Sequence, residues 1–230
     1  DEPTKGGQTI RLKSALRRGV AAAVIAGVVV SSGIPAYAGT WDIANGDITV
    51  KGASDESGNY NKVKQGDKDF EKDEGETVIT GESDKNTVTI DTSGGKVDVT
   101  FDDLKIDASD KGKAAVRVEG GHDATIELDG DNKLKSGSHN AGLEKNGNES
   151  SGKLTIKDDN DTKGSLTAKG GEGGGAGIGG GIKSTGSSIT IRGGTIKAVG
   201  GSNAAGIGDG AGRATGPTDD PNPGDLYICG

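Results

Sequence analysis

A repeated unit of about 30 residues most constrains the fold of this chain. From Lys96 onward, each unit contains three short segments rich in Val, Ile, Leu and Thr, always in the same order and separated by Gly, Asp and Asn turns. The first segments are 97–101, 124–128, 153–156 and 188–191; the second are 104–107, 133–136, 165–168 and 195–198; the third are 114–118, 141–144, 176–179 and 205–208. Segments this short cannot each bury a face alone, so the units must stack.

The repeat predicts an all-β, single-chain β-solenoid with three short strands per coil, right-handed by the general bias of crossover connections. In the alignment, Leu104, Leu134, Leu166 and Ile196 take equivalent places in the second segments. Composition agrees, because 44 glycines, 30% apolar residues and 3% aromatics exclude a broad layered core but allow thin rows of β-branched residues. An irregular β-sandwich and a partly disordered stalk stay open as alternatives.

The N-terminal region has the organisation of an export signal. A basic stretch at 11–18 precedes an apolar run at 20–30 and the small-residue pattern Ala36-Tyr37-Ala38. This order predicts a signal peptide cleaved after Ala38, and the apolar run is shorter than the roughly 20 residues of a membrane span. The predicted organisation is a signal peptide at 1–38, an N-terminal cap and first strands at 39–95, β-helix repeats at 96–214, and a linker at 215–230.

Charge and cysteine content narrow the classes of partner. The formal net charge is -8, which argues against nucleic acid because phosphate neutralisation requires clustered Lys and Arg. One cysteine, Cys229, excludes an internal disulfide framework. No membrane span is expected in the mature chain, which we expect to be a fragment with further sequence at both ends.

Acidic turns between the first and second segments are the candidate metal ligands. If the units are in register, these carboxylates stack along one edge, and carboxylates with nearby Asn side chains are ligands that Ca²⁺ prefers. The predicted ligands are Asp102, Asp103, Asp129, Asp131, Asp158, Asp159 and Asp161, with Asn132 and Asn160 in the same turns. Ca²⁺ is the one cofactor predicted. Simple solvated turns, where Asp and Asn are favoured by conformation, stay open as the other interpretation.

Catalysis is not expected. Hydrolysis of a glycan needs two carboxylates facing each other across a groove, whereas neighbouring acids in a strand point to opposite faces. His122 and His139 each lie in a predicted turn. Aromatic platforms for sugars are scarce: Phe101 is expected to pack inside, and Trp41 either caps the open end of the core or stacks against a sugar.

Four segments resemble a known type of repeat. They are Gly-Thr-Trp-Asp-Ile at 39–43, Ile-Glu-Leu-Asp-Gly-Asp-Asn at 126–132, Gly-Ser-Leu-Thr-Ala at 164–168 and Gly-Gly-Ala-Gly-Ile-Gly-Gly-Gly at 174–181. They are similar to the Gly-rich β-helical repeat regions of large surface proteins of Gram-positive bacteria and, more loosely, to β-helical carbohydrate-binding domains of bacterial surface proteins.

The resemblance implies a secreted or cell-surface location and transfers no active site. The function expected is that of a non-catalytic adhesin or carbohydrate-binding module, with a polysaccharide or host surface glycan as partner. The alternatives are a β-helix polysaccharide lyase or hydrolase, and a mechanical stalk that presents a downstream domain.

Overall fold

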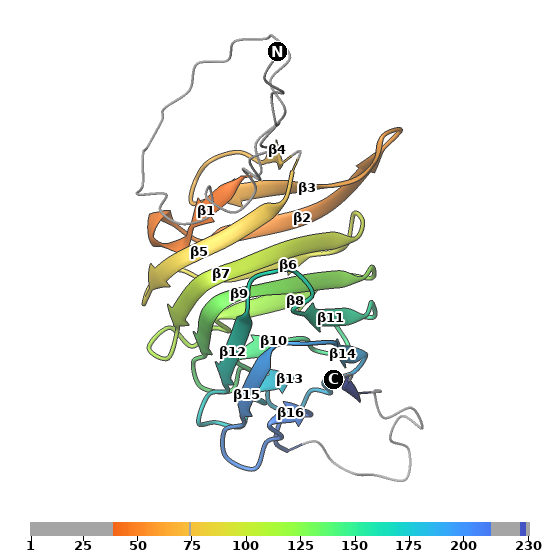
Figure 1. Ribbon diagram of the computed structural model, residues 1–230. Helices are drawn as coiled ribbons and strands as arrows, with labels where there is room; N and C mark the ends of the chain where they lie inside the picture. Colours follow the sequence, from red (N-terminus) through yellow and green to blue (C-terminus); the bar gives the residue numbers. More distant parts are fainter. Residues whose placement is uncertain (1–38, 74, 213–225, 229–230) are drawn as a thin grey trace, which may run out of the picture. The chain divides into compact units, whose positions relative to one another are not determined.

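The described part of the chain is all-β. The computed structural model describes residues 39–73, 75–212 and 226–228, which belong to one compact unit. Within these residues the only helical segment is the 3-10 turn η1 (Ile43–Asn45), and the strands form two sheets in which nearly all pairings are parallel (Figure 1). The predicted all-β class is confirmed, and the arrangement is compatible with stacked coils.

The chain alternates between the two sheets. The first sheet, sheet A, contains β1 (Thr40–Asp42), β5 (Thr77–Ser83), β7 (Val97–Asp107), β9 (Ala124–Lys135), β11 (Leu154–Lys157), β12 (Gly164–Lys169), β14 (Ile189–Ile191), β15 (Thr195–Val199) and β17 (Leu226–Ile228). The second sheet, sheet B, contains β2 (Ile48–Asp55), β3 (Gly58–Gln65), β4 (Glu71–Asp73), β6 (Val88–Asp91), β8 (Val116–Glu119), β10 (Leu143–Glu144), β13 (Ile178–Gly179) and β16 (Ile207–Gly208).

The core consists of apolar rows that run across the strands. Val50, Ile90 and Val118 are in register on β2, β6 and β8, and each is at most 1% exposed. Alternate residues of a strand point to opposite faces, so the residues between them point outward. Burying each such side chain stabilises the fold by about 1.5–3 kcal/mol, which lets a narrow core hold the sheets together.

Most predicted segments are strands, and one alignment is wrong by two residues. In the third segments, Leu143, Ile178 and Ile207 are in register as predicted. In the second segments, Leu134 is in register with Ile106, not with Leu104 or Leu166. The register between β7 and β9 shifts after Asp102, where β9 has one extra residue at the bend, and Asn132 is in register with Leu166 in place of the expected leucine.

The first two segments of the early units are joined. The structure has one long strand where two were expected, in β7 and again in β9, whereas later units keep β11 apart from β12 and β14 apart from β15. The alternation between sheets also begins before Lys96, since β1 and β2, and then β5 and β6, follow the same order.

The N-terminal end is closed by strands. Within the predicted N-terminal cap and first strands, 39–95, β3 and β4 continue sheet B with antiparallel pairing. Trp41 packs against the core, and its Nε1 donates to Asp73 Oδ2 at 3.1 Å. Phe101 is fully buried, as predicted. The Trp41 position agrees with a capping role.

Two predicted segments fall wholly or partly outside the described residues. The predicted signal peptide, 1–38, lies outside them, and so do 213–225 and 229–230 of the chain's C-terminal part. Within the predicted linker, β17 pairs in parallel with β14, so Leu226–Ile228 belongs to sheet A.

Candidate functional site

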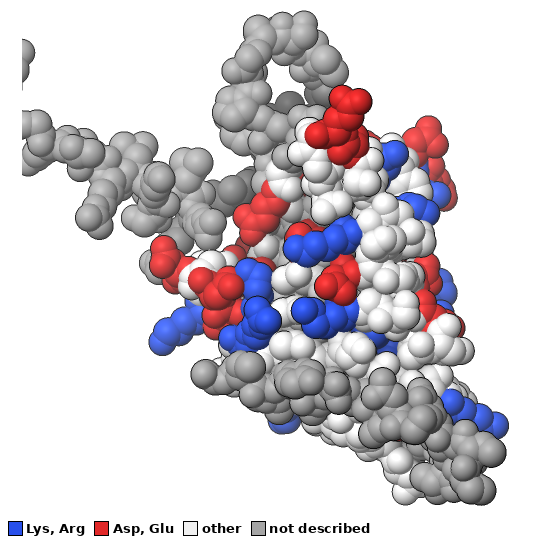
Figure 2. All heavy atoms as spheres, turned by 90° about the vertical axis from the view of Figure 1, so that its right-hand side faces the viewer, with Lys and Arg blue, Asp and Glu red and all other residues white. Residues whose placement is uncertain are grey.

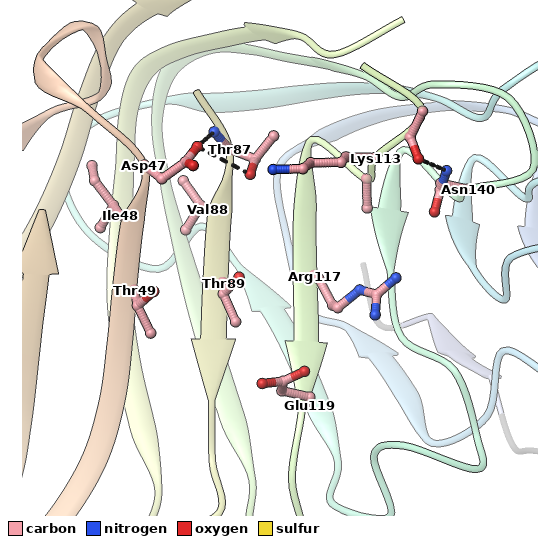
Figure 3. Close-up of a pocket in the computed structure, with 12 residues that line it drawn as sticks. Asp47, Ile48, Thr49, Thr87, Val88, Thr89, Lys113, Arg117, Glu119 and Asn140 are labelled. Carbon is pink, nitrogen blue, oxygen red and sulfur yellow. Dashed lines mark hydrogen bonds between the residues drawn. The ribbon is translucent and has the colours of Figure 1, made fainter. Parts of the chain in front are cut away.

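A shallow groove crosses the outer face of sheet B over β2, β6 and β8. Its volume is about 430 Å³. Figure 3 shows hydroxyl, cationic and anionic side chains directed into it from neighbouring strands. The residues that line it are Asp47, Ile48, Thr49, Thr87, Val88, Thr89, Gly112, Lys113, Ala114, Arg117, Glu119 and Asn140.

The floor of the groove is one row of polar residues. Thr49, Thr89 and Arg117 are in register on three successive parallel strands. They point outward because Ile48, Val88 and the residues that alternate with them fill the core. Parallel strands lie about 4.8 Å apart, so the row presents hydroxyl, hydroxyl and guanidinium groups at a regular spacing.

The Arg117 side chain is held by two carboxylates of the following unit. Its Nη2 lies 2.8 Å from Glu144 Oε1, and its Nη1 lies 3.6 Å from Glu149 Oε2. The Glu144 side chain is only 2% exposed, and its Oε2 accepts from the backbone N–H of Ala141 at 3.0 Å. Burial raises the pKa of Glu144, and the Ala141 amide and the Arg117 guanidinium partly offset that rise. The guanidinium therefore has a fixed direction and is not a free surface cation.

The rim of the groove carries both signs of charge. Asp47 Oδ1 accepts from the backbone N–H of Thr87 at 2.7 Å, and Asn140 Nδ2 donates to the carbonyl of Gly112 at 3.1 Å. Lys113 and Glu119 complete the charged groups that line the groove. Figure 2 shows the same intermingling on a wider scale, with cationic and anionic side chains side by side on one flank. Such a mixed lining suits a neutral, hydroxyl-rich ligand better than a strong ion.

The predicted acidic edge is only partly assembled. Asp102 and Asp129 are directly in register on β7 and β9. Asp103 Oδ1 accepts from the backbone N–H of Asp131 at 2.9 Å, and Asp131 Oδ2 lies 2.7 Å from Lys133 Nζ. The pKa of Asp131 is lowered, and the largest cause is its hydrogen bond with the Lys133 ammonium.

The acids of the third unit follow a different geometry. Asp159 pairs with Lys157 at 2.6 Å, and this contact lowers its pKa. Asp158 is half-buried beneath the backbone of Gly193, and Asp161 is exposed in the turn. These carboxylates do not converge with those of the earlier units.

The two asparagines are used by the protein itself. Asn132 is fully buried; its Oδ1 accepts from Leu104 N, and its Nδ2 donates to the carbonyls of Asp129 and Ser165. Asn160 Nδ2 donates to Asp129 Oδ1 at 2.6 Å. Among residues 39–73, 75–212 and 226–228, no group of three or more His, Cys, Asp or Glu side chains is placed to hold a metal ion. The calcium site stays a prediction that this geometry does not support, and calorimetry with Ca²⁺ is its test.

Sequence reasoning missed the buried charges beside the groove. Glu144 ends the segment 141–144, which was expected to be an ordinary strand, and Lys145 follows it directly, yet both residues are buried. Alternation from Leu143, which points inward, places Lys145 on the core side and is the signal that could have found it.

Comparison with protein-family models, with curated proteins and with solved structures gave no match. In the described part of the chain, no helix has the length and apolar character needed to cross a bilayer.

Proposed function

We propose that the chain is a right-handed β-helix of a secreted or cell-surface bacterial protein and that it binds glycans without catalysis through the groove on sheet B. The fold part rests on the in-register parallel rows that link successive units in both sheets. The resemblance to Gly-rich surface repeats and the export signal in the sequence support the location.

One observation carries the binding proposal: the in-register row Thr49–Thr89–Arg117 at the floor of a groove. Hydroxyls and a fixed guanidinium on a rigid sheet can pair with the hydroxyls of a sugar without reorganising. The groove is shallow and its floor contains no aromatic residue, so each contact is weak and several copies bound to one surface would act together.

Binding of the full chain to an array of neutral glycans, presented multivalently, tests this function. The matched variants are the double substitution Thr49→Val and Thr89→Val, and the control Thr125→Val on the outer face of sheet A. Each hydroxyl hydrogen bond contributes about 0.5–1.5 kcal/mol, so the double variant should lose about tenfold in affinity while the control keeps it.

Three outcomes would overturn the proposal. No glycan bound on the array would favour the mechanical stalk. Equal loss in the double variant and the control would place binding elsewhere. Release of unsaturated or reducing ends from a bound polysaccharide would favour the lyase or hydrolase.

A further inference from the structure

A second polar surface lies on sheet A, on the outward side chains of the second segments. We call it the lysine face. It has two rows in register across the strands: Glu82, Lys105, Lys133, Thr167 and Lys197 form the first, and Asp107, Lys135, Lys169 and Val199 form the second. The residues between the rows, such as Leu134 and Ala168, point into the core. The sheet therefore fixes the direction of every lysine in the two rows.

The lysine face has a positive excess on a chain whose net charge is -8. Its two rows contain five lysines and two carboxylates, Glu82 and Asp107, and Asp131 lies beside the first row; each of these three carboxylates already has one lysine partner. The ion pairs are Lys105–Glu82 at 2.6 Å, Lys133–Asp131 at 2.7 Å and Lys135–Asp107 at 3.0 Å. Lys169 and Lys197 are exposed and form no ion pair within the described residues.

Two pairs of lysines on this face are direct cross-strand neighbours. Lys105 is in register with Lys133, and Lys135 is in register with Lys169. Like charges directly opposite each other in a sheet are destabilising, and strands lie about 4.8 Å apart. The ion pairs of Lys105, Lys133 and Lys135 offset part of this repulsion, and an anion laid across the strands would offset more of it.

The face is also hollowed, and hydroxyl groups lie beside the lysines. A depression of about 680 Å³ is lined by Glu82, Lys105, Asp107, Lys133 and Lys135, among others. A third row, in register beside the first, contains Asp131, Ser165 and Thr195. Together with Thr167 it places hydroxyls among the ammonium groups.

We propose that the lysine face binds a linear acidic polysaccharide, whose carboxylates lie along the two lysine rows and whose hydroxyls contact the Ser and Thr side chains. The outward positions of these rows contain no aromatic residue on which a base could stack and no arginine, which disfavours a single-stranded nucleic acid. This surface lies on a different sheet from the groove with Thr49 and Thr89, so the two proposals do not depend on each other.

The test is binding of polygalacturonate to the full chain, followed by calorimetry over a series of salt concentrations. The variant carries Lys133→Gln, Lys169→Gln and Lys197→Gln. The matched control carries Lys68→Gln, Lys111→Gln and Lys153→Gln, which remove the same charge from exposed lysines elsewhere. Circular dichroism and melting temperature establish that both variants fold.

The face variant should lose about tenfold or more in affinity at low salt and show a shallower salt dependence, because fewer counterions are displaced. The control and the double variant Thr49→Val and Thr89→Val should bind polygalacturonate as the parent does. Equal loss in both lysine variants, absence of binding at low salt, or tighter binding of single-stranded DNA at the same face would each overturn the proposal. If neutral glycans still bind in the groove, such a failure leaves the proposed function standing.

Discussion

Lys145 offers the sharpest test of the interior of this fold. Its side chain is fully buried on the core side of the chain, and its Nζ donates to the carbonyls of Ser150 and Ser187 at 2.9 and 3.0 Å. Burial lowers the pKa of Lys145 from 10.5 to about 8, and the negative charge of Asp123 offsets only part of this. At neutral pH the folded chain therefore carries a charged amine in its interior.

The sign of the resulting pH dependence follows from proton binding. The unfolded chain keeps this proton up to a pH of about 10.5, whereas the folded chain releases it near pH 8. Between these values the unfolded state binds more protons, so stability rises with pH. A shift of this size corresponds to roughly 3 kcal/mol in total, of which about 1.8 kcal/mol is gained between about pH 7.5 and about pH 9.5.

Urea unfolding of the parent chain and of Lys145→Met, each at about pH 7.5 and about pH 9.5, measures the pH-dependent contribution of Lys145 to the free energy of unfolding. Methionine cannot titrate, so the difference in unfolding free energy between the two proteins should change by about 1.8 kcal/mol in favour of the parent at the higher pH. The contributions of the other titrating groups cancel in this comparison because both proteins contain them. Lys153→Met, at an exposed position, should follow the parent at both values. A parent-minus-variant difference that stays constant within about 0.5 kcal/mol would refute a buried, charged Lys145.

Three further substitutions probe the polar and glycine positions. Asn132→Ala leaves three buried or partly buried backbone groups unpaired and should destabilise the chain by about 2–4 kcal/mol, whereas the exposed Asn160→Ala should cost about 1 kcal/mol or less, both measured by urea unfolding. Asp73→Ala removes the acceptor of four donors at the N-terminal cap and should lower stability by about 2–4 kcal/mol, with a shift in the fluorescence of the chain's single tryptophan. Gly142→Ala places a Cβ 2.7 Å from two backbone atoms and should lower the melting temperature, while Gly121→Ala, whose nearest neighbour is 3.6 Å away, should leave it nearly unchanged.

The regular part of the fold could be predicted from the sequence. The third segments share an Ala-Gly-Leu or Ala-Gly-Ile core, and small residues on both sides of one inward side chain leave a single alignment, so Leu143 and Ile178 are placed correctly. The second segments offer more than one inward apolar position, as in Leu104 and Ile106 or Leu166 and Ala168. A shift of two residues keeps every side chain on the same face. The sequence therefore could not decide whether Leu134 aligns with Leu104 or with Ile106.

The candidate site was less predictable because it depends on pairing between distant segments. The sequence contains few aromatic platforms for sugars, and the groove and the lysine face consist mainly of polar and charged side chains instead. It could not show that Thr49, Thr89 and Arg117 share one row, since their separations along the chain are unequal. The acidic turns were predicted to stack along one edge; Asp102 and Asp129 are in register, and the extra residue at the bend of β9 shifts the register after them.

Two of the buried polar residues, Asn132 and Lys145, lie where neighbouring units differ in length. Asn132 lies at the bend where β9 is one residue longer than β7, and its amide pairs with backbone groups of the strands on either side. Lys145 begins the first of two long turns, 145–153 and 180–188, and its ammonium bonds one carbonyl in each. Where the unit length changes, the ladder of backbone hydrogen bonds is interrupted and buried N–H and C=O groups lack partners. Leaving these groups unpaired costs more free energy than losing the apolar contacts of one side chain, so a polar side chain that pairs with them is favoured. The buried side chains of Asn132 and Lys145 therefore mark two positions where the repeat changes length.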